Sequence, residues 1–426
     1  MSNRDDEFYE RGERRPARRD DRRRDDRRRD DRYDDYDDYN DRPARMSSSG
    51  GRSSASKSGS SKGNAPRRSG SRKKKNNTKA LVLLIVEILV AVGLLFAAYM
   101  VFFRVDVTKV GKVDMNEEKI NSSINEGVAD NQQMLGYTNL ALFGVDTRDE
   151  AKNQGAIKKN TRSDTIIIAS INNDTGDIKL CSVYRDTYLN LSNDKYTKCN
   201  AAYGEGGPEQ AISMLNMNLD MDIKGFVTVG FKGLTDVVNA LGGVTIDVTD
   251  AEIPHLNSYQ STMATELGMD YTPVTSAGVQ TLNGLQATAY CRIRYTAGDD
   301  FKRAERQRTV LMACIEKAQG MNYSQLEKIA NAAFEETYTS LDLSEILDLL
   351  KNITKYKVVD NNGFPEESMR TTGTIGKKGS CVIPTDLASN VKWLHQFLFE
   401  DDTYEVSSDV QKYSDKIKAD TDPYLK

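Results

Sequence analysis

Hydrophobic and polar residues divide the chain into segments of different character. Residues 1–79 contain almost no aliphatic side chains and run from "RRDDRRRDDRRRDD" to "SSSGGRSSASKSGSSKGNAPRRSGSRKKK". Such a segment cannot bury enough apolar surface to offset the entropy of ordering it. We therefore expect residues 1–79 to form a disordered tail.

A long apolar run follows the tail. Residues 80–103, "ALVLLIVEILVAVGLLFAAYMVFF", contain one charge, Glu87, and the run exceeds the ~20 residues that span a bilayer. It is too long and too far from the N-terminus for a cleavable signal peptide. Lys and Arg without acids precede it, whereas mixed charges follow it. The positive-inside rule then predicts a cytoplasmic tail, one transmembrane helix, a linker over 104–137 and an extracytoplasmic remainder.

Strand-like and helix-like patterns alternate from residue 138 onward. "DTIIIASI" and "DIKLCSVY" flank the turn "NNDTGD", which indicates a hairpin, and "GFVTV", "FKGLTDVVNA" and "VTIDV" indicate strand, helix and strand. This alternation predicts an α/β fold over 138–400, a layered α/β/α domain with a central mixed sheet. We expect a long loop at 252–278 and a frayed polar tail at 401–426.

Cysteine and histidine usage excludes several chemistries. The five cysteines are Cys181, Cys199, Cys291, Cys314 and Cys381. Their number is odd and they form no C-x-x-C pair, so neither a disulfide framework nor a zinc site is indicated. The two histidines, His255 and His395, have no Ser or Cys partner in a recognisable motif, which argues against nucleophilic catalysis of the Ser-His type.

The stretch "YCRIRYTAGDDFKRAERQR", residues 290–308, concentrates arginine between apolar segments. We interpret "AYCRIRY" as a strand, which places Arg292 and Arg294 on one face. In the helix that follows, Asp300, Arg303 and Gln307 project within about 60° of one another, on a stripe that later turns continue with apolar residues. Those five side chains are predicted to face inward. Lys302, Glu305 and Arg308 are expected in solvent, and Arg306 is undecided.

Charged side chains on an inward stripe need partners, because burying them unpaired is costly. Two arginines on a strand face are often simply solvated, but Arg292, Arg294 and Arg303 together exceed what Asp300 can neutralise. The excess favours a multivalent anion, and guanidinium groups suit phosphate oxygens.

Acids and arginines also stand at predicted strand ends. Asp146 in "FGVDTRD" follows one strand, Arg162 and Asp164 in "NTRSDT" begin the next, and Arg185 in "YRDT" ends the hairpin. Strand ends line the crevice where α/β sheets bind ligands, and Mg²⁺ is typically held by one or two carboxylates plus substrate phosphates. Each motif alone is more often a cap or an ion pair. Together they predict carboxylates for a metal and arginines for phosphate.

Several segments together resemble one known family. "LFGVDTR", "RSDTIII", "VYRDTYL", "KCNAAYGEGG", "LTDVVNALGGVTIDV", "LNGLQATAYCRIR" and "DDFKRAERQR" occur in the order found in LytR-CpsA-Psr proteins, and the resemblance covers about residues 140–314. The sequence departs from the family pattern at Tyr184, where proline is common, at Cys199 and Cys291, which replace aliphatic residues, and in the long spacer "EAKNQGAIKKN".

The resemblance implies a Mg²⁺-dependent phosphotransferase on the outer face of Gram-positive cells. Such proteins move a glycopolymer (teichoic acid, capsular polysaccharide or similar) from a polyprenyl-pyrophosphate carrier to peptidoglycan. It also implies roles for residues: Mg²⁺ on Asp146 and Asp164, pyrophosphate among Arg162, Arg185, Arg292, Arg294 and Arg303, and support from Asp300 and Gln307.

Three further functions stay open. A transcriptional attenuator, a role under which the family was first named, is disfavoured because the folded domain is expected outside the cell and the tail contains no helix that could read DNA, so no nucleic-acid partner is expected. The second is a lipid-glycan scaffold without turnover, and the third is a pyrophosphatase that acts on the same lipid. The general base is open among Asp146, Asp164 and Asp186.

Overall fold

A computed structural model describes residues 111–145, 161–294, 299–334 and 337–425. The predicted tail, 1–79, and the predicted membrane span, 80–103, lie outside the described residues, so both stay predictions. Of the helices that are described, none has the length and apolar character needed to cross a bilayer.

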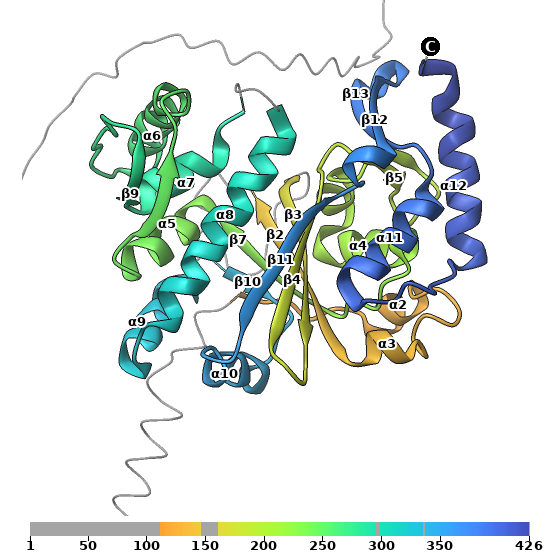
Figure 1. Cartoon of the computed structure of the whole chain (residues 1–426), viewed down its shortest axis with the longest axis horizontal. Coiled ribbons are helices and arrows are strands. Elements are labelled where there is room, and N and C mark those ends of the chain that lie inside the picture. Colours follow the sequence, from red (N-terminus) through yellow and green to blue (C-terminus); the bar gives the residue numbers. More distant parts are fainter. Residues whose placement is uncertain (1–110, 146–160, 295–298, 335–336, 426) are drawn as a thin grey trace, which may run out of the picture. The chain divides into compact units, whose positions relative to one another are not determined.

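A seven-stranded mixed sheet forms the centre of the described part of the chain, in the order β1-β10-β7-β2-β3-β4-β11 (Figure 1). β2 runs parallel to β7 and antiparallel to β3, and β4 is antiparallel to β3 but parallel to β11. The strands are β1 Gly111–Lys112, β2 Tyr137–Val145, β3 Ser163–Asn172, β4 Asp177–Val183, β7 Gly225–Gly230, β10 Thr337–Thr339 and β11 Lys357–Phe364.

Helices cover both faces of this sheet, because β3 is apolar on both sides. Ile166 and Ile168 pack into a core with α4 and α11, whereas Ile167 and Ala169 pack into a second core with α8 and α10. The predicted mixed α/β domain is confirmed. These helices are α4 Ala201–Leu219, α8 Asp299–Gln319, α10 Leu343–Lys351 and α11 Leu387–Phe399.

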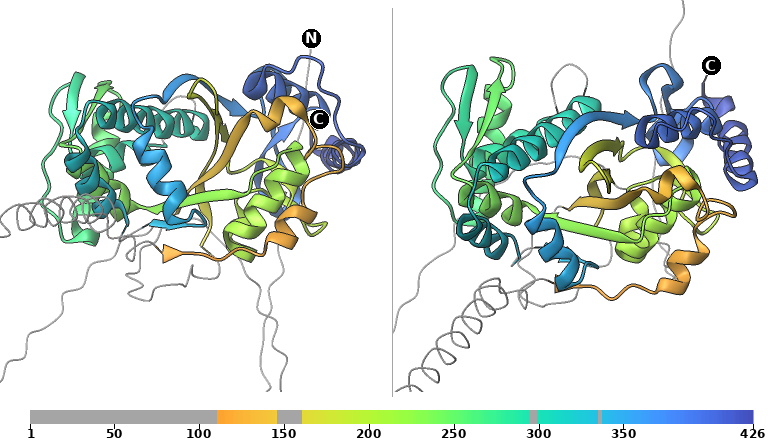
Figure 2. Two further views of the ribbon diagram at one scale, coloured as in Figure 1. Left: turned by 90° about the horizontal axis from the view of Figure 1, so that it is seen from below. Right: turned by 60° about the horizontal axis from the view of Figure 1, so that its bottom comes forward.

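A separate layer, which we call the side lobe, packs against α8. Its own core joins residues of α5, β8, α6, β9 and α7 to Val310 of α8. The same elements stay together beside the sheet in both views of Figure 2. The lobe consists of α5 Phe231–Ala240, β8 Val244–Val248, α6 Ile253–Leu267, β9 Gly278–Leu282, α7 Gly284–Arg292 and α9 Tyr323–Phe334.

Two sequence predictions are wrong in the side lobe. The expected loop at 252–278 contains α6, whose buried residues Leu256, Gln260, Met263 and Ala264 follow helical spacing. The expected strand "AYCRIRY" belongs largely to α7. Asn283 and Gln286 cap that helix reciprocally, and each side chain accepts a hydrogen bond from the other's backbone N–H.

Both ends of the described region are also folded more extensively than expected. In the predicted linker 104–137, α2 Glu117–Ser122 and α3 Gln132–Leu135 contribute Ile120 and Met134 to the main core. In the predicted frayed tail, α12 Ser408–Thr421 packs beside α11 (Figure 1).

Shorter elements complete the fold. They are β5 Tyr188–Asn190, β6 Tyr196–Lys198, β12 Arg370–Thr374, β13 Ser380–Pro384 and three 3-10 turns, Glu367–Met369, Gly376–Lys378 and Asp422–Tyr424. β5 pairs with β6 and β12 with β13, each antiparallel.

The burial of α12 gives a test of its structural role. Ile417 is 1% exposed in the main core, so Ile417→Ala should lower the free energy of unfolding by about 2–5 kcal/mol. Denaturant unfolding of the full chain measures this. Lys412→Ala, an exposed position on the same helix, serves as the control. Equal stability of the two variants would show that the helix is only loosely attached.

Candidate functional site

Five strands of the central sheet reach one common edge. Val145 at the end of β2 pairs with Ser163, the start of β3, and with Gly230, the end of β7. Val183 at the end of β4 pairs with Phe364, the end of β11. The described strand-end motifs, around Asp164 and Arg185, therefore meet at this edge.

Three arginines surround two aspartates at the edge, an arrangement we call the arginine cluster. Asp164 lies 2.9 Å from Arg185, 3.1 Å from Arg303 and 3.6 Å from Arg294, measured between carboxylate oxygens and guanidinium nitrogens. Asp300 lies 3.5 Å from Arg303, 3.7 Å from Arg185 and 3.8 Å from Arg294. Asp186 lies 3.9 Å from Arg185 and 3.4 Å from Lys198, so four cations stand against three anions, an excess of one positive charge.

The charges in the arginine cluster shift one another's pKa values. Burial would raise the pKa of Asp164, but the positive charges of Arg303, Arg185 and Arg294 lower that pKa overall. Burial and the neighbouring arginines lower the pKa of Arg303, against the attraction of Asp164, although a guanidinium stays charged at neutral pH. Asp164 is therefore held as an anion.

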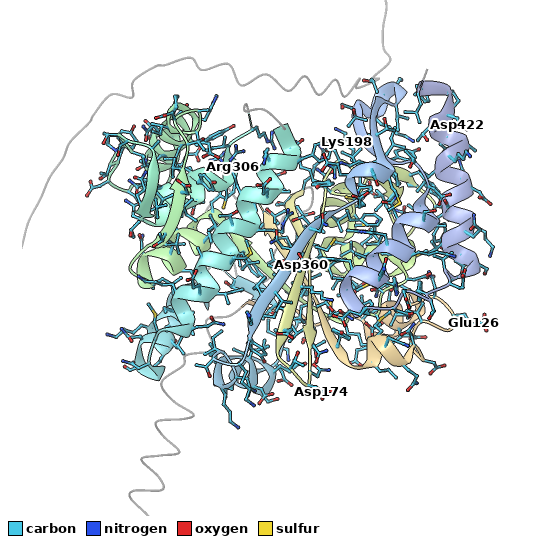
Figure 3. The ribbon with its side chains drawn as sticks, viewed as in Figure 1. Glu126, Asp174, Lys198, Arg306, Asp360 and Asp422 are labelled. Atoms are coloured by element: carbon cyan, nitrogen blue, oxygen red, sulfur yellow. The ribbon has the colours of Figure 1, made fainter. Side chains whose placement is uncertain are left out.

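Arg185 is positioned by its backbone as well as by its charge. The Cys199 thiol donates to the carbonyl oxygens of Tyr184 and Arg185, at 3.2 and 3.3 Å, and the Asn200 N–H donates to the Arg185 carbonyl at 3.1 Å. Lys198, labelled in Figure 3, lies 3.4 Å from Asp186. The sequence interpretation missed Lys198, which pairs with an aspartate considered as a general base.

Arg292 lies apart from these ion pairs. It ends α7, and its guanidinium carbon lies 4.5 Å from the centre of the Phe231 ring and 5.2 Å from that of Tyr259. The prediction that Arg292 and Arg294 share a strand face is wrong, because the chain is helical up to Arg292 and leaves the helix before Arg294.

Several buried polar atoms at this edge lack a hydrogen-bond partner in the described part of the chain. They are Arg185 Nε, Arg292 NH1, Ser163 Oγ and Asn200 Oδ1. Buried polar atoms in folded proteins are nearly always paired. Two of these atoms are guanidinium donors. Arg185 Nε lies 3.7 Å from Asp300 and 3.9 Å from Asp186, beyond hydrogen-bond distance, so it still has a hydrogen bond to offer to an anionic acceptor.

The remaining predicted site residues fall in different places. Gln307 lines a small cavity together with Asp164, Arg185, Asp300 and Arg303, on the face of α8 that its helical spacing predicts. Arg162 precedes β3 and its side chain is exposed. Asp146, predicted as a metal ligand, lies outside the described residues.

The structure corrects the expectation for one arginine of α8 and settles the position of another. Arg308, expected in solvent, is 7% exposed and donates to Ser182 Oγ at 2.7 Å and Asn361 Oδ1 at 2.8 Å. Arg306, left undecided and labelled in Figure 3, is buried and donates to Glu252 Oε1 at 2.7 Å. Both arginines are buried because α8 packs against the side lobe on one face and against the sheet on another.

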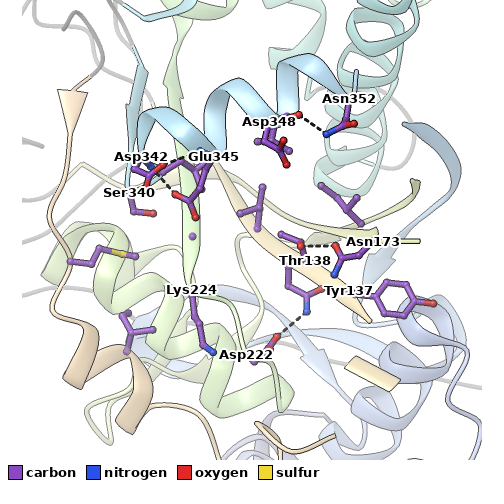
Figure 4. A pocket seen from close by; sticks show the side chains of 18 of the residues that line it. Tyr137, Thr138, Asn173, Asp222, Lys224, Ser340, Asp342, Glu345, Asp348 and Asn352 are labelled. Carbon is purple, nitrogen blue, oxygen red and sulfur yellow. Dashed lines mark hydrogen bonds between the residues drawn. The ribbon is translucent and has the colours of Figure 1, made fainter. Parts of the chain in front are cut away.

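A far larger cavity, about 1080 Å³, lies at the opposite edge of the sheet. Figure 4 shows Tyr137, Thr138 and Asn173 from the other ends of β2 and β3 beside it. Seven acidic side chains and three lysines line it, which makes it unfavourable for an anion. Its lining acids are Asp114, Glu117, Asp174, Asp222, Asp342, Glu345 and Asp348.

The carboxylates of the arginine cluster are suitable ligands for Mg²⁺. Oxygen donors suit this ion, which typically takes few protein carboxylates and completes its shell with water and phosphate. Within the described residues, no group of three or more His, Cys, Asp or Glu side chains forms a metal cage. Because Asp164 already pairs with three guanidiniums, a cation beside it would need anionic substrate oxygens to offset the added charge.

The described residues thus form a mixed α/β sheet with arginines and aspartates gathered at one of its edges. The sequence profile of the LytR_cpsA_psr family matches residues 100–385, and the chain belongs to this family.

Relatives with assigned names match parts of the chain. It is 31% identical over 193 residues to polyisoprenyl-teichoic acid–peptidoglycan teichoic acid transferase TagV from Bacillus subtilis, covering 44% of this chain and 47% of that protein. It is 27% identical over 307 residues to biofilm regulatory protein A from Streptococcus mutans, covering 64% and 72%. The chain thus spans about half the length of the first relative.

A solved structure shares the fold. A crystal structure of a Streptococcus agalactiae protein aligns with a TM-score of 0.52 at 24% identity, covering 70% of this chain and 95% of that chain. The alignment supports the architecture of the domain.

The buried pair of Arg306 and Glu252 predicts a pH-dependent stability. Burial would raise the pKa of Glu252, but hydrogen bonds from the Thr249 backbone and Arg306, with the charge of Arg306, lower that pKa below its ordinary 4.5. The stabilisation is therefore complete above about pH 4.5 and is lost as the pH falls through the lowered value.

Glu252→Gln should lower the free energy of unfolding at pH 7 by about 3–5 kcal/mol, because it removes the negative charge that neutralises the buried Arg306 guanidinium. Denaturant unfolding between pH 3 and pH 7 should show the difference from wild type shrinking below about pH 4.5. Glu305→Gln, in an exposed pair with Lys302, is the control. A constant difference at all pH values would mean that the carboxylate charge is not what stabilises the helix contact.

Proposed function

We propose that this chain is a membrane-anchored phosphotransferase that moves a glycopolymer from a polyprenyl-pyrophosphate carrier to peptidoglycan. Family membership and the name of the Bacillus subtilis relative support this function. In the reaction, a phosphoryl group bearing the glycan leaves the carrier, which departs as polyprenyl phosphate. A sugar hydroxyl of the acceptor gains the new phosphodiester bond and loses its proton.

The unpaired guanidinium donors are the observation that carries the proposal. Arg185 Nε and Arg292 NH1 are buried without a hydrogen-bond partner among the described residues. A pyrophosphate would supply acceptors for both, and its negative charge would offset the positive excess of the arginine cluster. Guanidiniums aimed at the phosphate would also stabilise charge that develops as the phosphoryl group moves.

The proposed reaction also uses Mg²⁺. Asp164, which is among the described residues, and Asp146, which is not, would be its protein ligands. When bound, the ion supplies further stabilisation of phosphate charge. Asp164 is poorly suited as general base, because neighbouring arginines lower its pKa. Asp300 instead lies within 4 Å of all three arginines, from the first turn of α8.

The proposed location rests on the sequence alone. The apolar run at 80–103 and the basic segment before it support a single-pass membrane protein with a cytoplasmic N-terminus. The domain would then face a carrier embedded in the outer leaflet and the peptidoglycan beyond it.

Loss of a single arginine should impair glycan transfer. In full-length protein with Mg²⁺, a polyprenyl-pyrophosphate-linked saccharide and peptidoglycan fragments, Arg292→Ala and Arg294→Ala should each lower kcat/KM by about 10²–10³-fold. Mass spectrometry of the linked product measures the transfer. Lys302→Ala, an exposed neighbour on α8, should retain activity within about twofold.

Three outcomes would contradict the proposal in distinct ways. Wild-type protein that binds the lipid but forms no product would be a scaffold. Release of polyprenyl phosphate without a linked acceptor would indicate a pyrophosphatase. Undiminished transfer in the presence of excess EDTA would show that Mg²⁺ is not required.

Membrane topology can be tested separately. Protease added to intact protoplasts should digest a C-terminal epitope tag and leave an N-terminal tag protected, because the domain is proposed to lie outside. The opposite pattern would overturn the location.

A further inference from the structure

Three side chains from distant segments meet beside the arginine cluster. They are Tyr184, directly before Arg185, Phe301, directly after Asp300, and Arg370, the first residue of β12. The Tyr184 and Phe301 rings meet edge to face, with centres 4.7 Å apart and planes at 85°. This contact joins the end of β4 to the first turn of α8.

Arg370 covers both rings. Its guanidinium carbon lies 4.0 Å from the centre of the Phe301 ring and 4.9 Å from that of Tyr184. Its NH1 donates to Tyr184 Oη and to the Pro365 carbonyl oxygen, each at 3.1 Å. The Arg370 guanidinium thus lies over the faces of both rings. It also holds the Tyr184 hydroxyl by a hydrogen bond.

Gly363 of β11 leaves room for the Tyr184 side chain. A Cβ at this position would lie 2.0 Å from Tyr184 Oη. Tyr184 itself is 7% exposed. Gly363, Phe301 and Arg370 therefore enclose the Tyr184 side chain closely.

We propose that Arg370 is a positioning residue of the anion site, acting through Tyr184 and Phe301. By holding these rings together it sets the 3.7 Å separation of Arg185 from Asp300. The inference rests on the proposed function, because it assigns Arg370 to the alignment of that same site. A proline at residue 184, common in the family, would provide neither the ring nor the hydroxyl.

The positions of Arg185 and Asp300 need support from the two rings, because the direct ion pair between Arg185 and Asp300 is weak. Arg185 and Asp300 are both partly exposed, and exposed pairs at such distances hold their geometry poorly. Displacing a group that binds a reacting phosphate by about 1 Å can cost up to about 10²-fold in rate.

The chain contains a matched control. Lys378 donates to Tyr188 Oη at 2.6 Å and lies 4.6 Å from the centre of that ring. This is also a cation on a tyrosine with a hydrogen bond to the hydroxyl, but Tyr188 is not adjacent to a member of the arginine cluster. Lys378→Met therefore removes the same kind of contact elsewhere.

The test compares Arg370→Met with Lys378→Met in the full-length protein. For Arg370→Met we expect kcat of glycan transfer to fall about tenfold, while the Kd for geranyl pyrophosphate, measured by calorimetry, changes less than about threefold. Lys378→Met should retain wild-type kcat. Arg370→Lys should recover part of the loss, because it restores the cation without the planar fork. If Arg370→Met does not fold, Phe301→Leu tests the same contact.

The outcomes separate this inference from the proposed function. Wild-type protein that neither binds geranyl pyrophosphate nor transfers glycan would contradict the function itself. Active wild type with equal kcat in Arg370→Met and Lys378→Met would leave the function standing and overturn the positioning role. The positioning role is likewise overturned if Phe301→Leu, used in place of Arg370→Met, keeps wild-type kcat.

Discussion

The sharing of two aspartates among three arginines is the interaction on which the site depends. Asp164 comes from the start of β3 and Asp300 from the start of α8, while Arg185 follows β4. Each of the three arginines approaches both carboxylates within 4 Å. Like-charged guanidiniums can gather only because the carboxylates lie between them. The remaining excess is one positive charge, and two buried donor nitrogens are left for a ligand.

Much of this arrangement could be predicted from residue patterns. The hairpin at residues 163–183 and the strand-helix-strand of 225–248 follow from alternation and periodicity, and both are present. Asp164 and Arg185 could be placed together because antiparallel neighbours bring a strand start and a strand end to one edge. Gln307 and Arg303 could be placed inward by their spacing on a helix.

The failures have physical causes. "AYCRIRY" alternates like a strand, but the capping pair Asn283 and Gln286 starts a helix that continues through it. Arg308 was assigned to solvent on the assumption that α8 has one buried stripe. Leu311 and Met312, three and four residues later, pack on the sheet, so the signal for a second buried face was present in the spacing. The ring contact of Tyr184 and Phe301 joins residues more than a hundred positions apart, which no local pattern reveals.

Binding of pyrophosphate at the arginine edge can be observed in a crystal structure of the chain with geranyl pyrophosphate. We expect phosphate oxygens within about 3 Å of Arg185 Nε and Arg292 NH1, the two guanidinium nitrogens that lack acceptors among the described residues. Phosphate bound elsewhere, such as in the acidic cavity at the opposite edge of the sheet, with those nitrogens still unpaired, would contradict pyrophosphate binding by the arginines.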